Sequence, residues 1–483
     1  TVGVAGDEAG LLQTVTAEST VEGEDSHFTS LKSIPGKLHA DLKAGANVAS
    51  AQTLEANLDL SSPGVKLHGS GFIVTPDEAI ALGLNSIDGI KNHIRDYRNG
   101  RDITQRPRGV MVIDLFGLEA EEVRQKFPSL YQWVVERVKP ERDQNNRAFY
   151  RDNWWLFGEA RKEWRRMYAN IDCYISTVET SKHRIFMVLD KNILPDNKLI
   201  NFALPERYKF GVISSRLHTR WAESNSSSLG SYKGDVVYVK TRCFETFPFP
   251  TPTEEQKTKI RDLAEQIDAH RKRQQSQHEK LTLTNIYNVL EKLRKEEPLN
   301  DKEKLTHQQG LVAILKELHD NLDRAVFSAY GWDDLAEQLV GQPGATTPYP
   351  DKPEAQAAAE EELLSRLVDL NTERAAEEAQ GKVRWLRPEF QAPELAGTQV
   401  STDPEKTGTQ TTKPKALPEG KLNWPKALQD QISAVRDQLT LTPLTAKALS
   451  SQFKRAPKGV QDVLDALVSL GVVIEENAIY RLV

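Results

Sequence analysis

Val110-Met-Val-Ile-Asp-Leu-Phe116 is a nearly continuous apolar run, interrupted only by Asp114. A run of this length and composition is typical of a strand that is buried on both faces. Further strand candidates follow along the chain at Cys173–Val178, Ile185–Val188, Leu199–Ala203, Gly211–Ser214 and Val236–Val239. Together these runs predict a sheet-containing domain over residues 69–250.

Helical patterns lie between these strands. Apolar residues recur at helical spacing from Glu119 to Val138, and we expect Pro128 in the middle to kink or split that helix. Pro76, followed by two acidic residues, suits the first turn of a short helix over Asp77–Leu82. The mixture of strands and helices predicts a domain of the α+β class.

A helical region is predicted at residues 251–333. Thr253-Glu-Glu-Gln256 is a capping box, in which the hydroxyl and the amide side chain each satisfy a free main-chain N–H. Apolar residues then share one face in three successive segments, namely Ile260, Leu263, Ala264 and Ile267; Ile286, Val289, Leu290 and Leu293; and Leu311, Leu315, Leu318 and Leu322. We expect these helices to form an antiparallel bundle.

The remaining segments are predicted from composition and pattern. Residues 334–423 are rich in Pro, Gly, Thr and charges, which predicts a partly disordered linker with one helix over Ala355–Ala379. Residues 424–483 combine helices with a final hairpin, the pattern of a winged-helix domain. Thr1–Ala5 and Leu11–Thr16 are predicted to form a hairpin, so we expect residues 1–68 to be the trailing edge of an upstream domain and a connector.

The composition excludes several classes of protein. The net charge of -6 over 483 residues is compatible with a basic binding face, because such a face acts locally. Cys173 and Cys243 are the only cysteines, which excludes a cysteine-built zinc site and fits a reducing cytoplasm. The sequence contains neither an apolar run long enough to cross a membrane nor a signal peptide.

Catalytic motifs are missing from the sequence. Adenine methylation needs a glycine-rich loop and an Asn/Asp-Pro-Pro-aromatic segment that holds the flipped base. Asp152-Asn-Trp-Trp155 matches the second only superficially, because it lacks both prolines. The carboxylates and lysines of Glu179–Lys182 and Pro195–Lys198 could suit a metal-dependent nuclease, but a solvated turn explains them better. We therefore predict neither a catalytic residue nor a metal site.

Basic residues cluster with aromatic residues in the predicted α+β domain. One cluster surrounds Tyr97, a second spans Arg142–Trp155 and a third spans Arg161–Arg166. A guanidinium fits phosphate oxygens and the paired acceptors of guanine, although a solvated face with local ion pairs is the alternative. Several clusters in one domain favour duplex DNA, and we assign Trp154, Trp155 and Trp164 to the core. The candidate DNA-binding residues are Arg95, Tyr97, Arg98, Arg101, Arg106, Arg108, Lys182, His183, Arg184, Lys240 and Arg242.

A run of motifs resembles the target recognition domain of MmeI-like DNA methyltransferases, which are type II restriction–modification and phage-defence proteins. The motifs are Gly69–Val74, Tyr97–Asp102, Arg106–Phe116, Thr180–Phe186 and Val239–Pro250. The resemblance covers roughly residues 1–333 and part of Ala375–Phe390. The passage from an aromatic-proline end into capped helices also looks like the specificity subunits of type I systems.

The resemblance implies an adenine-N6 methyltransferase that uses S-adenosylmethionine in its full-length form. Its catalytic domain would end near Glu18, so this chain would bind no cofactor itself. Double-stranded DNA is the expected partner, in the bacterial cytoplasm, with other restriction or phage-defence subunits as further partners. The alternatives are a non-catalytic specificity subunit that recruits a separate methylase or nuclease, and a protein-interaction scaffold.

Overall fold

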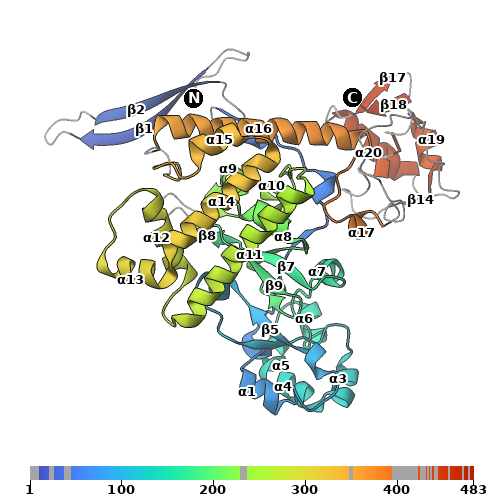
Figure 1. The fold of residues 1–483 in the computed structure, drawn as a ribbon. Coiled ribbons are helices and arrows are strands. Elements are labelled where there is room, and N and C mark those ends of the chain that lie inside the picture. Colours follow the sequence, from blue (N-terminus) through green and yellow to red (C-terminus); the bar gives the residue numbers. More distant parts are fainter. Residues whose placement is uncertain are drawn as a thin grey trace. The chain divides into compact units, whose positions relative to one another are not determined.

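The chain is a mixed α and β protein, as predicted (Figure 1). The computed structural model describes residues 10–20, 27–36, 45–228, 236–347, 352–393, 422–424, 431, 434–435, 438–439, 444–454, 457–469, 473–476 and 479–482. The chain divides into two compact units, residues 1–399 and residues 400–483. Among the described helices, none combines the length and the apolar character that a membrane span requires.

One four-stranded sheet contains the apolar run from which the fold was predicted. Its strands are β4 (Ile73–Val74), β5 (Ile94–Arg98), β6 (Met111–Ile113) and β10 (Leu194–Pro195), in the order β10-β5-β6-β4. β6 confirms the predicted buried strand, because Val112 and Ile113 are fully buried. β5 is antiparallel to β6 and parallel to β10.

Short helices surround this sheet, and a proline divides two of them as predicted. α3 (Ala120–Lys126) ends before Phe127 and α4 (Pro128–Arg137) begins at Pro128, where the missing N–H of proline costs nothing. The other helices are α1 (Pro76–Ala81), α2 (Gly100–Thr104), α5 (Lys139–Asp143), α6 (Ala148–Asp152) and α7 (Lys162–Tyr168), with 3-10 turns at Val48–Ser50, Glu55–Asn57, Ser70–Phe72 and Ile90–Asn92.

A second four-stranded sheet is entirely antiparallel. It consists of β3 (Ser61–Pro63), β7 (Cys173–Val178), β9 (Phe186–Asp190) and β11 (Leu199–Phe202), in the order β3-β11-β7-β9. The buried Ser176 hydroxyl lies 2.9 Å from Asn201 Oδ1 and joins the two middle strands. A small third sheet consists of β8 (Thr180–Ser181), β12 (Ser227–Ser228) and β13 (Val236–Val237). Its strand β8 follows β7 directly in the sequence.

The strand predicted at Gly211–Ser214 is wrong. These residues are the end of helix α8 (Arg207–Ser214), in which Val212 and Ile213 are fully buried. A short apolar run that is buried on every side has no periodicity that separates a strand from a helix. Gly211 allows helix α11 to pass close by, because a Cβ there would lie 2.5 Å from Ile260 Cγ2.

The predicted helical region follows. It contains α11 (Glu254–Gln277), α12 (Leu283–Arg294), α13 (Asp301–Gly310) and α14 (Val312–Tyr330). Helices α9 (Arg216–Ser224) and α10 (Lys240–Cys243) come before this region in the chain, and α15 (Asp333–Leu339) begins at its last residue. The capping box at Thr253 is confirmed, with Gln256 N donating to the hydroxyl and Thr253 N donating to Gln256. Tyr287 OH and His319 Nε2, 2.9 Å apart, link α12 to α14 inside the bundle.

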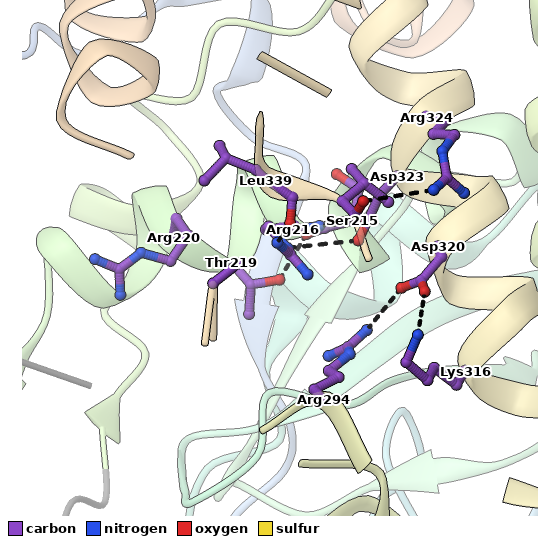
Figure 2. A network of polar contacts seen from close by, with 12 residues as sticks. Ser215, Arg216, Thr219, Arg220, Arg294, Lys316, Asp320, Asp323, Arg324 and Leu339 are labelled. Atoms are coloured by element: carbon purple, nitrogen blue, oxygen red, sulfur yellow. Dashed lines mark hydrogen bonds and ion pairs between the residues drawn. The ribbon is translucent and has the colours of Figure 1, made fainter. Parts of the chain in front are cut away.

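A buried ionic network joins α9 to α12 and α14 (Figure 2). Asp323 accepts a hydrogen bond of 2.8 Å from the main-chain N–H of Arg216, whose guanidinium donates to the Leu339 carbonyl. Asp320 lies between Arg294, at 3.9 Å, and Lys316, at 2.8 Å. Burial raises the pKa of Asp323, but Arg216 and Arg294 offset part of that cost.

The segment predicted as a linker is largely folded onto the first unit. α16 (Glu354–Ala379) buries Leu363 and Leu367, and α17 (Pro388–Gln391) follows it. Asn371 is fully buried, where its amide accepts from Gln52 N and donates to the Gln52 and Thr246 carbonyls. α16 confirms the helix that the sequence predicts over Ala355–Ala379. The polar composition gave no sign that this helix packs against other parts of the chain, because its apolar stripe is narrow and its partners lie far away in the sequence.

The chain begins, within its described part, with the hairpin of β1 (Gly10–Thr20) and β2 (His27–Gly36). The predicted strand at Leu11–Thr16 lies in β1. Its observed partner is β2, which lies in a stretch that is predicted to be a connector. The predicted partner strand Thr1–Ala5 lies outside the described residues.

The second unit contains helices α19 (Ala446–Ser451) and α20 (Pro457–Ser469). Its strands are β14 (Leu422–Asn423), β15 (Leu444–Thr445), β16 (Phe453–Lys454), β17 (Val473–Glu476) and β18 (Ile479–Leu482), in sheets ordered β14-β16 and β15-β18-β17. The hairpin of β17 and β18 agrees with the predicted terminal pair of strands. The winged-helix assignment stays a prediction.

We expect Asn371→Ala to lower the free energy of unfolding by about 2–3 kcal/mol, because it leaves the buried Thr246 carbonyl and the part-buried main-chain groups of Gln52 without their partner. Urea unfolding of the full chain measures this loss. Thr372→Ala, on the exposed side of the same helix, is the matched control. Equal effects of the two substitutions would contradict the packed position of α16.

His218 predicts acid sensitivity of the first unit. Its Nδ1 lies 2.9 Å from the Ile213 carbonyl and its Nε2 lies 3.1 Å from Tyr238 OH, and burial lowers the pKa to about 4. Below about pH 6.5, the ordinary pKa of histidine, His218 takes up a proton in the unfolded chain but stays neutral in the folded chain. The contribution of neutral His218 to the free energy of unfolding is therefore fully present above about pH 6.5, and it is lost as the pH falls toward about 4.

Between about pH 7 and about pH 5 we expect His218 to account for a loss of roughly 2 kcal/mol. Urea unfolding at both pH values should show a smaller loss for His218→Gln than for the unchanged chain. His307→Gln, on α13, should retain the full acid sensitivity. An unchanged pH dependence in His218→Gln would refute the assignment.

Candidate nucleic-acid interface

The densest group of predicted contact residues lies at the corner between β5 and α2. Asn99 caps α2 by accepting hydrogen bonds from the N–H groups of Arg101 and Asp102, and Asp102 returns one by accepting from Asn99 N. Gly100 permits close packing on β7, because a Cβ there would lie 3.0 Å from Val178 Cγ1. The sequence Asn-Gly-Arg-Asp therefore forms a tight capped corner rather than a free turn.

Asp102 also holds Arg108 at the far end of the same loop. One carboxylate oxygen accepts from Arg108 N and Nε, at 2.8 and 2.9 Å, and the other accepts from a terminal guanidinium nitrogen at 2.8 Å. Burial alone would raise the pKa of Asp102, but these hydrogen bonds and that from Asn99 hold the pKa below its ordinary value. Asp102 thus stays ionised inside the protein while Arg108 reaches the surface.

Arg106 fixes the middle of this loop to the helical bundle. Its guanidinium donates to the carbonyls of Gln275 and His278, at 2.9 and 2.7 Å, where α11 ends. Gln275 returns a hydrogen bond of 2.6 Å to the Gln105 carbonyl. The loop is therefore held from two sides, by α2 and by α11.

Arg98 and Arg101 are less constrained. Arg98 donates to the carbonyl of Tyr97 at 3.0 Å, and the exposed Arg101 donates to the side chain of Gln105 at 3.0 Å. Within the described residues, neither forms an ion pair with a carboxylate. Their charges are thus open to an external anion.

Two other predicted residues of β5 point into the protein. Tyr97 is 3% exposed and donates to Asp196 at 2.6 Å, and burial raises its pKa. Arg95 donates to the Lys191 and Asn192 carbonyls, at 2.6 and 3.2 Å, and lies over the ring of Trp164. Both side chains stabilise the junction of the two sheets, and their contact with DNA stays a prediction.

Helix α12 brings the turn after β8 toward the same corner. Thr284 donates to the Thr104 carbonyl of α2, and one turn later Asn288 Oδ1 lies 2.8 Å from Lys182 Nζ and 2.8 Å from His183 Nε2. Residues four apart lie on one helix face, so the corner and the turn share a support. Burial lowers the pKa of His183, whereas Lys182 is exposed.

Arg184 is enclosed. It donates to the Val178 and Val236 carbonyls, the second at 2.8 Å, and stacks on Tyr238 with its guanidinium 5.1 Å from the ring centre. Burial lowers its pKa, as expected for a cation removed from water. This arrangement holds β7 to β13.

Lys240 and Arg242 lie apart from the corner, on α10. Lys240 pairs with Glu245 at a cavity of about 680 Å³, and Arg242 is exposed. Arg161, Lys162 and Arg166 of the third predicted basic cluster line the same cavity. The structure thus separates the basic residues into an α2 corner and a charged cleft.

Sequence reasoning placed the three tryptophans correctly, because Trp154, Trp155 and Trp164 are at most 9% exposed. It overlooked the roles of Asp102 and Asn288. The Asn99-to-Asp102 spacing of a capping box was the available signal for Asp102, whereas Asn288 is recognisable only once α12 lies against the turn. In the described residues, no group of acidic, histidine and cysteine side chains could hold a metal ion.

Comparison with known proteins defines the class of this region. Residues 51–251 match the family model described as "MmeI, target recognition domain". This part of the chain is similar to target recognition domains of the MmeI type, in agreement with the resemblance found in the sequence.

A solved structure of the Type IIL restriction-modification enzyme MmeI in complex with DNA is similar in fold, with a TM-score of 0.49 and 19% sequence identity. The similarity covers 72% of this chain and 40% of that chain, so the present chain spans about two fifths of the MmeI length. No curated protein sequence matches the chain.

We expect Arg184→Met to destabilise the first unit by about 2–3 kcal/mol, because two part-buried carbonyls lose their donor. Lys182→Met, two residues away and exposed, should change the free energy of unfolding by less than about 0.5 kcal/mol. Urea unfolding compares them directly. A reversed order would show that Arg184 is held less firmly than its contacts indicate.

Proposed function

We propose that residues 51–251 recognise a short sequence in double-stranded DNA. The match to the target recognition domain model carries this proposal, and the arginine-rich α2 corner gives it a physical basis. Arginines on a rigid support can contact phosphates, which fix the register, while neighbouring groups reach the base edges of the major groove.

The corner supplies both kinds of contact. Arg98, Arg101 and Lys182 present charges without a carboxylate partner in the described structure, which suits phosphates. Arg108 is oriented by Asp102, which suits a contact that needs a defined direction. The helical bundle supports the corner through Arg106 and Asn288.

We further propose that the complete enzyme methylates adenine N6, with S-adenosylmethionine as methyl donor, in a restriction–modification or phage-defence system of the bacterial cytoplasm. The described residues do not fit the cofactor. The sequence has no glycine-rich loop for it, and the cavity beside α7 is lined by charged residues and carries no aromatic side chain for an adenine ring. We therefore propose that the methyl-transfer step belongs to other residues of the enzyme.

The test is selection of the full chain against a pool of random DNA duplexes, at low and at high salt, with sequencing of the retained duplexes. Recognition predicts enrichment of one short motif and weaker retention at high salt. Retention that is salt-sensitive but unselective would refute independent sequence recognition. No retention at low salt would refute DNA binding and favour a protein-interaction scaffold.

We expect the joint replacement of Arg98, Arg101 and Lys182 by alanine to weaken binding for all duplexes alike. Each lost phosphate contact should reduce the slope of log affinity against log salt by about 0.9. Replacing Lys259, Lys302 and Lys304, which are exposed cations of the helical region, is the matched control. Titrations by fluorescence anisotropy over a salt series measure both slopes, and equal slopes would exclude the corner as the interface.

A further inference from the structure

Arg108 is bound through one edge of its guanidinium and leaves the other edge open. Nε and Nη2 donate to the two oxygens of Asp102, at 2.9 and 2.8 Å. A guanidinium has five N–H groups, so both N–H groups of Nη1 and one of Nη2 remain. In the described residues Nη1 has no hydrogen-bond partner, and the side chain is 36% exposed.

The support beneath this arginine is rigid. Asp102 is fully buried and is fixed by Asn99, and it also accepts from the main-chain N–H of Arg108. Arg106, two residues earlier, is held by the carbonyls at the end of α11. The position and direction of the Arg108 guanidinium are therefore set before any ligand arrives, which reduces the entropy lost on binding.

The surface beyond Arg108 is open. Gly109 follows it with a φ of +71°, and a Cβ there would meet no atom within 4 Å. A ligand can therefore approach the main chain at Gly109 and the outer edge of Arg108 together.

We propose that Asp102 is a positioning residue that presents the outer edge of Arg108 to a pair of acceptor atoms on DNA. The proposal rests on the DNA recognition proposed above. The acceptor pair is either two oxygens of one phosphate or O6 and N7 of one guanine, since both match the spacing of a guanidinium edge.

The Asp102 carboxylate has two opposite effects on the binding of Arg108 to DNA. It cancels much of the long-range attraction of Arg108 for DNA, but it fixes the angle at which the N–H groups point outward. The Arg101 guanidinium is exposed and, among the described residues, bonds to the side chain of Gln105 and to no carboxylate, so its charge is uncancelled but its direction is not fixed. The first arrangement favours a directed contact, and the second favours general attraction to the backbone.

A double-mutant cycle on the full chain tests the proposal, with duplexes that the unchanged chain retains in the selection as probes. Arg108→Ala should weaken binding roughly 10-fold, and Asp102→Asn should weaken it by a similar factor, since an amide cannot accept both N–H groups. In the Arg108→Ala background, Asp102→Asn should then have little further effect.

If Asp102 only stabilises the fold, a different result is expected. Asp102→Asn should then weaken DNA binding in the Arg108→Ala background as much as it does in the unchanged chain. Thr104→Val is the matched control, since it removes a hydrogen bond to the Gly100 carbonyl within α2 and leaves the Arg108 guanidinium alone. Thermal unfolding of each variant reports the stability of the corner separately from affinity. Losses that add in the double variant, or an Asp102→Asn chain that binds normally, would overturn the proposal.

Sequence and salt dependence distinguish the two acceptors. A loss that is uniform across duplexes, with a salt slope smaller by about 0.9, identifies a phosphate. A loss confined to duplexes with guanine at one position identifies the base. If the unchanged chain retains no duplex, DNA recognition and this inference both fall, whereas additive losses in a chain that binds DNA overturn only the inference.

Discussion

Arginine side chains that donate to main-chain carbonyls hold the first unit together. Arg142 donates to the carbonyls of Leu67 and Leu156, and Arg271 donates to that of Phe186. Arg184 and Arg106 make the same kind of contact at other junctions. Carbonyls at the ends of strands and helices lack partners within their own element, and a guanidinium can satisfy several at once. Burying the charge of an arginine costs free energy, which the hydrogen bonds to these carbonyls offset. Each contact therefore depends on the relative position of the two elements that it joins.

The same chemistry explains why the interface is difficult to predict from sequence. An arginine that binds a carbonyl and one that binds a phosphate use the same N–H groups, so residue type and clustering do not separate them. Arg101 and Arg106 lie five positions apart, yet the first is exposed and the second is tied to α11. The sequence therefore predicts the region of the proposed interface, and the packing of α11 and α12 decides which of its side chains remain available.

The fold is predictable where its causes are local. The capping box at Thr253 and the helix break at Pro128 depend on neighbouring residues, and both appear as expected. The strand predicted at Gly211–Ser214 fails because burial on all sides removes the periodicity. The helix predicted over Ala355–Ala379 appears as α16, but its packing is not predictable, because Asn371 finds its partners more than a hundred positions away, at Gln52 and Thr246. Long-range partners of this kind leave no trace in local composition.

The segment from Asn99 to Arg108 has a property that matters for the exchange of specificity between related proteins. The side chains that orient Arg108 lie inside this segment, and its Arg106 side chain is anchored on the main-chain carbonyls of Gln275 and His278. Carbonyls are present whatever the side chain, so substitutions at the end of α11 leave the Arg106 contact in place. A short gene segment could thus move between relatives as a cassette and carry its contact geometry with it.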